Sequence, residues 1–284
     1  MFRNLSCGAI GVPASFDQAI AYAKLGEFEG IDVPIGEVIP LIDQHGADYV
    51  KALFADNGLK MGSIGFPVRW MGSEEDWSTD LLNLTKYCEA ASQIGATRAA
   101  TWVPSWNDER DWDENCAFHR NRLGPVAEVM GAYGVRMGLE FLGPKTLRAG
   151  KKFEFIHTME QMLELCSCLG QNAGLLLDAW HWYTSGGTLA QLKKLTNENV
   201  VYVHINDAPP DIALDDQVDS VRALPGETGV INLTGFLQVL RDIGYDGPVT
   251  PEPFSARLNA MEDKSEAVKL AGKMLKQVFE ETIE

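Results

Sequence analysis

VRMGLE at residues 135–140 is a short apolar run that ends on a carboxylate, and three later runs have the same form. They read GLLLD at 174–178, VVYVH at 200–204 and PVTPE at 248–252. Short apolar runs separated by longer amphipathic stretches are typical of buried strands in an α/β protein. Four of them in succession, each ending in Glu, Asp or His, favour a fold in which parallel strands carry reactive side chains at one edge.

Four earlier segments have similar composition, so the chain has eight candidate strands. They are expected at 7–12, 30–34, 60–66, 98–104, 135–142, 173–179, 200–206 and 248–254. Amphipathic helical patterns lie between them, at 15–25, 77–94, 115–133, 158–169, 233–243 and 262–279. Because the segments alternate along the chain, they predict an α/β fold of the (β/α)8 TIM-barrel type.

The composition limits the class of protein. The chain has 284 residues, 45% hydrophobic and 23% charged, and no linker or low-complexity tract, so one barrel domain over residues 1–284 is expected. A net charge of −16 argues against a nucleic-acid partner, which needs a basic surface. No segment has the length and apolar character of a membrane span or a signal peptide. Five scattered cysteines favour a reducing cytoplasm as the location of the protein. The sequence is compatible with a homo-oligomer.

The four side chains that end the later runs are all of metal-ligand type. They are Glu140, Asp178, His204 and Glu252. A single carboxylate after a strand is commonly a helix N-cap, but four such residues on four successive strands converge on one face of a barrel. Burying three carboxylates there without a cation would cost several kcal/mol for each uncompensated charge. We therefore expect one divalent metal ion, Mn2+, Co2+ or Mg2+ for this oxygen-rich set, with Zn2+ or Fe2+ as alternatives.

The motifs around these residues resemble a known family. LEF at 139–141, LDAWH at 177–181, VHIND at 203–207 and TPEPF at 250–254 are similar to motifs of the xylose isomerase-like TIM barrel superfamily of sugar isomerases and epimerases. RALPGETG at 222–229, followed by Ile231 and Asn232, is similar to that family's R-x-x-P-G-x-G-x-I-D/N pattern with one extra residue. The resemblance is greatest to 2-keto-myo-inositol isomerase and the ketose 3-epimerases, and it covers the second half of the chain.

This resemblance implies a function and roles for individual residues. Glu140, Asp178, His204 and Glu252 would bind one metal, and Glu140 and Glu252 would also act as catalytic acid and base. His181 and Arg222 would hold substrate oxygens. The implied activity is isomerisation or epimerisation of a keto-sugar or keto-inositol through a metal-stabilised enediolate.

Two alternatives differ in mechanism or class. A lyase of the same superfamily, such as an inosose dehydratase or an enzyme that cleaves 3-keto-glycosides, would use the same enolate and then expel an oxygen substituent. The metal set cannot separate it from an isomerase. A DNA-repair endonuclease would need more histidine ligands and a basic groove than five histidines and this charge allow.

Other features near the expected barrel mouth are less specific. Trp102, near the end of the fourth expected strand, could stack on a sugar ring, and Lys145 could hold a substrate anion. The acidic segment 207–228 is long for a barrel loop, and we expect a lid that substrate orders. Pro251 and Pro253 flank Glu252 where the family more often has an apolar β residue before the glutamate.

Overall fold

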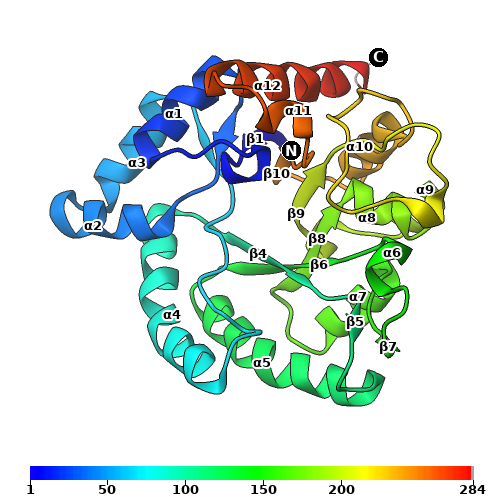
Figure 1. Ribbon diagram of the computed structural model, residues 1–284. Coiled ribbons are helices and arrows are strands. Elements are labelled where there is room, and N and C mark those ends of the chain that lie inside the picture. The colour runs from blue at the N-terminus through cyan, green and yellow to red at the C-terminus, as the bar shows by residue number, and fades with distance from the viewer. Residues whose placement is uncertain (283–284) are drawn as a thin grey trace.

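The strands form a closed ring in a computed structural model, which describes residues 1–282 (Figure 1). Their order around the ring is β3-β2-β1-β10-β9-β8-β6-β4, and every neighbouring pair in it is parallel. The bounds are β1 Phe2–Leu5, β2 Gly30–Ile31, β3 Lys60–Met61, β4 Arg98–Val103, β6 Arg136–Phe141, β8 Ala173–Asp178, β9 Val200–Ile205 and β10 Pro248–Pro251. The Ile64 amide donates to the Arg98 carbonyl at 2.9 Å and closes the ring between β3 and β4. The predicted TIM barrel is confirmed.

Helices surround the barrel on its outer side (Figure 1). The longer ones are α1 Phe16–Leu25, α2 Ile35–His45, α3 Ala47–Asp56, α4 Glu74–Ile94, α5 Trp112–Ala132, α7 Met159–Ser167, α10 Leu233–Asp242 and α12 Lys264–Glu281. Short helices are α6 Lys145–Arg148, α8 Ala179–Thr184, α9 Leu189–Leu192 and α11 Ala256–Asn259. Capping boxes at Ser15, Asp111 and Thr158 satisfy the first amides of α1, α5 and α7. Among residues 1–282, no helix has the length and apolar character needed to cross a membrane.

The barrel core explains the composition of the central strands. All six residues of β9 are buried, and five of six in β6 and β8 are buried as well. A parallel strand covered by helices outside and by side chains inside has no solvated face, so it is apolar almost throughout. The exceptions are the residues that end these strands, and these form the site described below.

The first strand is not where the sequence predicted it. Residues 7–12 form the 3-10 turn η1 Gly8–Ile10, which ends at Gly11 with φ +69°, and β1 precedes it. Ile10 and Val12 are buried, so the apolar pattern is real but belongs to a turn. The helices α2 and α3 between β2 and β3 were not predicted, and neither was the two-stranded ribbon of β5 Trp106–Asn107 and β7 Phe153–Glu154.

Candidate active site

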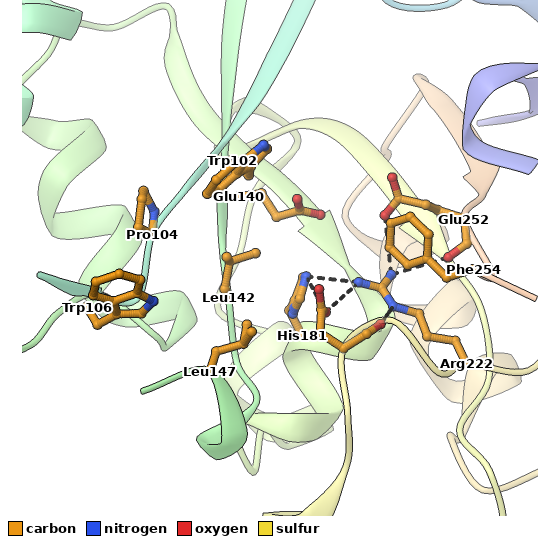
Figure 2. Close-up of a pocket in the computed structure, with 11 residues that line it drawn as sticks. Trp102, Pro104, Trp106, Glu140, Leu142, Leu147, His181, Arg222, Glu252 and Phe254 are labelled. Carbon is orange, nitrogen blue, oxygen red and sulfur yellow. Dashed lines mark hydrogen bonds and ion pairs between the residues drawn. The ribbon is translucent and has the colours of Figure 1, made fainter. Parts of the chain in front are cut away.

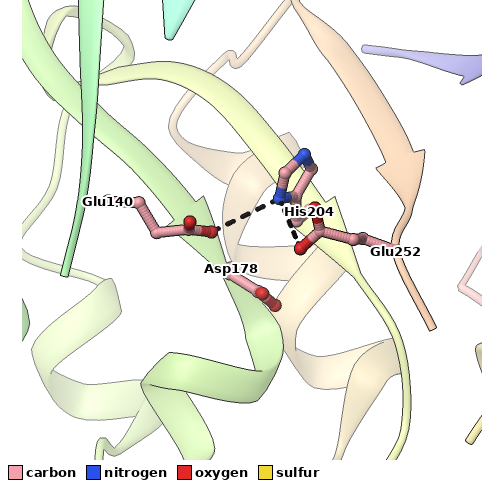
Figure 3. Close-up of side chains that lie close together, drawn as sticks. All are labelled: Glu140, Asp178, His204 and Glu252. Atoms are coloured by element: carbon pink, nitrogen blue, oxygen red, sulfur yellow. Dashed lines mark hydrogen bonds and ion pairs between the residues drawn. The ribbon is translucent and has the colours of Figure 1, made fainter. Parts of the chain in front are cut away.

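The four predicted ligands come together at the C-terminal ends of their strands (Figure 3). One ligand atom from each of Glu140, Asp178, His204 and Glu252 lies within 4.8 Å of the others. The parallel register sets this arrangement, because Asp178 lies beside His204 on the neighbouring strand. Glu140, Asp178 and His204 are buried, and Glu252 is partly exposed to the space above them.

The charges in this cluster favour a bound cation. The Nδ1 atom of His204 lies 3.3 Å from Glu140 Oε1 and 3.2 Å from Glu252 Oε2. Burial raises the pKa of Glu140 above its usual range. Burial alone would lower the pKa of His204, but the carboxylates of Glu252 and Glu140 raise it instead. Three carboxylates and one imidazole are a donor set that suits a divalent metal, and a metal would keep all of them deprotonated.

Asp178 is at once a helix cap and a member of the cluster. Its Oδ1 accepts from the backbone amide of Trp180 at 2.8 Å, which begins α8, and from the side-chain amide of Asn206 at 3.2 Å. Its Oδ2 accepts from Arg222 at 2.8 Å. Asp178 therefore caps α8 and is at the same time a metal-ligand candidate.

Arg222 is the buried cation beside the cluster (Figure 2). Its Nη1 donates to Asp178 Oδ2 at 2.8 Å and to Glu252 Oε2 at 3.2 Å, and its Nη2 donates to Asp219 Oδ1 at 2.8 Å. The guanidinium also lies 4.6 Å from the ring centre of Phe254. The planar guanidinium of Arg222 thus orients two of the metal-ligand candidates, Asp178 and Glu252. The ammonium group of a lysine acts as a point charge and would not fix both orientations.

Both ring nitrogens of His181 face hydrogen-bond donors. The Gly143 amide donates to its Nδ1 at 3.2 Å, and Arg222 Nη2 lies 3.3 Å from its Nε2. Burial is the largest cause that lowers the pKa of His181, to about 3, so the ring is neutral near pH 7. Gly143 must be glycine here, because a Cβ would lie 2.2 Å from the His181 carbonyl oxygen.

A cavity of about 500 Å³ opens above the cluster. Its lining side chains are Trp102, Pro104, Trp106, Glu140, Leu142, Leu147, His181, Asp219, Arg222, Glu252 and Phe254 (Figure 2). A pocket of this size, with polar groups gathered at one place, is the form expected of a small-molecule site.

Comparison with known proteins identifies the family. Residues 20–278 match the family described as Xylose isomerase-like TIM barrel. The chain belongs to this family. It is 25% identical to an inosose isomerase of Halalkalibacterium halodurans over 259 residues, which is 89% of this chain and 87% of that protein.

Solved structures of the family have the same fold. A xylose isomerase domain protein from Alicyclobacillus acidocaldarius superimposes with a TM-score of 0.83 at 27% identity, covering 97% of each chain. A structure described as IOLI protein with a binding zinc atom gives a TM-score of 0.78 at 19% identity, covering 99% of each chain.

The structure places three of the four substrate-contact candidates in the cavity. His181, Arg222 and Trp102 line it, but Lys145 is not among the lining residues. Lys145 is on α6, and its ammonium lies 2.6 Å from Asp215. A role for Lys145 in substrate binding would therefore require that this ion pair open.

The loop at 207–228 carries an acid that sequence reasoning missed. Asp219 lines the cavity and pairs with Arg222, three residues further on. A carboxylate three residues before a functional arginine is the signal that could have indicated it. The loop is anchored where Asp207 pairs with Ala223 and accepts from the Gly229 amide at 2.7 Å. That substrate orders this loop as a lid stays a prediction.

A bound divalent ion should stabilise the folded protein against heat. We expect one Mn2+ or Co2+ per chain by elemental analysis. The melting temperature should rise by several degrees with metal, because a ligand at about 100 times its Kd adds about 2.7 kcal/mol to the native state. His204→Ala should abolish most of this rise. If the melting temperature of the metal-free protein did not change on addition of Mn2+ or Co2+, the proposed metal site would be contradicted.

Proposed function

We propose that this chain is a divalent-metal-dependent isomerase or epimerase of a keto-sugar or keto-inositol. The observation that carries the proposal is the pair of glutamates on two sides of the cluster. Glu140 reaches it from β6 and Glu252 from the end of β10, and the His204 imidazole lies between their carboxylates (Figure 3). Both glutamates also line the cavity.

Two carboxylates in this arrangement can act on one substrate carbon from different sides. One takes the proton beside the carbonyl and the other returns it, which is general acid–base catalysis. Arg222 lines the same cavity, and its positive charge offsets the negative charge that develops on the substrate oxygens. His181 lines the cavity beside Arg222 and would hold one of those oxygens. When bound, the divalent cation would polarise the substrate carbonyl as a Lewis acid.

The relatives support the substrate class and the cation. The inosose isomerase is similar along almost the whole chain, which favours a cyclic keto-polyol. The zinc in the IOLI structure supports a divalent ion in this family. The oxygen-rich donor set favours Mn2+, Co2+ or Mg2+, with Zn2+ or Fe2+ as alternatives.

Deuterium exchange tests the proposal. Metal-loaded protein is incubated in deuterated water with 2-keto-myo-inositol and a panel of ketohexoses. We expect at least one substrate to give an isomer of the same skeleton that carries one deuterium at a carbon beside the carbonyl. No deuterium uptake from any of them would contradict the proposal. Loss of water or of an alcohol, visible by mass, would indicate the alternative lyase reaction, which shares the enolate.

A further inference from the structure

The cavity has two chemically different halves (Figure 2). Glu252, Arg222 and His181 lie on one side, and Glu140 extends toward them from beside Trp102. The opposite wall is formed by Trp102, Pro104, Trp106, Leu142 and Leu147. None of these five side chains carries a charge, and only the indole nitrogens can donate a hydrogen bond.

The apolar wall is built from several elements. Trp102 is the second-last residue of β4, Trp106 begins β5, and Leu147 is on α6. The ribbon of β5 and β7 holds Trp106 in place, since it pairs with Glu154 and the Lys151 ammonium lies 3.5 Å from the centre of its ring. Trp102 is 46% exposed although it lies within the barrel mouth. A large aromatic face left open in a concave site is typical of a surface that a ligand covers.

A substrate made only of hydroxylated carbons fits this wall poorly. Hydroxyl groups placed against it would lose their water and find few partners, which costs free energy for each group. An apolar or aromatic substituent would instead be removed from water there, which is favourable. The cavity of about 500 Å³ lies in the range that holds ligands larger than a single sugar ring.

The charges around the cavity disfavour a substrate that carries a phosphate or another anionic group. Four carboxylates surround one guanidinium; the carboxylates belong to Glu140, Asp178, Asp219 and Glu252. A divalent cation would leave one negative charge in excess. Among residues 1–282, Arg222 is the only lysine or arginine in the lining. Arg148, on α6, donates to the Gly143 carbonyl and pairs with Glu154. A neutral substrate is therefore favoured over a phosphorylated one.

We infer that the substrate is a neutral sugar or cyclitol ketone with an apolar, preferably aromatic, substituent that packs against Trp102, Trp106 and Leu147. This rests on the proposed function, because it places the ring of the ketone at the metal cluster. The substituent then points toward the β5–β7 ribbon, on the side of the cavity away from Arg222.

Paired glycosides test the inference without turnover. Binding of methyl and phenyl glycosides of glucose, galactose and mannose, in both anomeric forms, is measured by titration calorimetry on metal-loaded protein. For at least one sugar, the phenyl glycoside should bind about tenfold tighter than its methyl partner, as expected for a buried aromatic contact. Glucose 6-phosphate should not compete.

Substitutions test whether the apolar wall of the cavity causes the preference for phenyl glycosides. Trp106→Ala should reduce the phenyl preference to about twofold or less, while Trp106→Phe should retain most of it. Trp112 is 39% exposed and does not line the cavity, so Trp112→Ala is the matched control and should leave the preference unchanged.

Equal binding of phenyl and methyl glycosides, or no binding of any phenyl glycoside, would overturn the inference. A preference that survives Trp106→Ala would overturn it as well. Free ketoses that exchange deuterium while the glycosides show no preference would leave the proposed function intact. A phenyl preference without any deuterium exchange would contradict the proposed chemistry alone.

Discussion

Glutamine at position 140 or 252 is expected to lower turnover by about 100- to 10,000-fold, the usual cost of losing a general acid or base. Glutamine keeps a carbonyl oxygen that can face the metal, but it cannot take up the substrate proton. Each variant should therefore retain most of its metal and lose nearly all of its activity. Initial rates on the best keto-substrate, with metal content measured on the same samples, check this expectation.

A matched substitution separates the catalytic effect from a general effect of removing a charge. Glu75 is exposed on the first turn of α4, and Glu75→Gln should leave both rate and metal content unchanged. Deuterium uptake into the substrate should stop in at least one of the two cluster variants. Near wild-type turnover in either of them, with metal bound, would exclude the two-carboxylate mechanism and favour a hydride shift.

The sequence indicated the central strands well because their physical constraints are simple. A strand buried on both faces must be largely apolar. The sequence VVYVHI of β9 is apolar at every position except Tyr202 and His204. Charged residues at the ends of such runs stand out, and parallel strands place them at one face of the barrel. The four ligand candidates were found in this way.

The first strand was missed because its inward position is polar. Asn4 in β1 is fully buried, and its side-chain amide donates to Asp32 Oδ1 and to Thr250 Oγ1, both at 2.9 Å. Tyr202 donates to the same carboxylate at 2.9 Å. This hydrogen-bonded layer inside the barrel replaces the apolar side chains that a strand prediction requires. The partners come from strands far apart in the sequence, so the pattern of β1 alone could not reveal them.

The apolar half of the cavity was only partly predictable for a related reason. Trp102 lies in a strand, and its place near the barrel mouth followed from the strand assignment. Trp106 is positioned by pairing between β5 and β7, which are more than forty residues apart in the sequence. Asp219 reaches the cavity through the path of an irregular loop, which no periodicity encodes.

The largest effect on stability is expected from Arg222→Met. The Arg222 side chain is 1% exposed and contacts Asp178, Asp219 and Glu252. Removing one partner of a buried charge network leaves the others uncompensated and costs about 3–5 kcal/mol. Urea denaturation of the metal-free protein should show this loss in the free energy of unfolding. The variant should also lose activity when metal is restored, because the orientation of Glu252 depends on the guanidinium.

An exposed arginine on α11 supplies the comparison. Arg257 pairs with Glu227 and its side chain is 60% exposed, so Arg257→Met should cost less than about 1 kcal/mol. Arg222→Lys keeps the charge but not the planar fork, so it should recover part of the stability and little of the activity. If Arg222→Met were no more destabilising than Arg257→Met, the buried carboxylates would not depend on this cation. The metal-free site would then have to relieve their repulsion by taking up protons, and the unfolding free energy of the variant would fall as the pH rises.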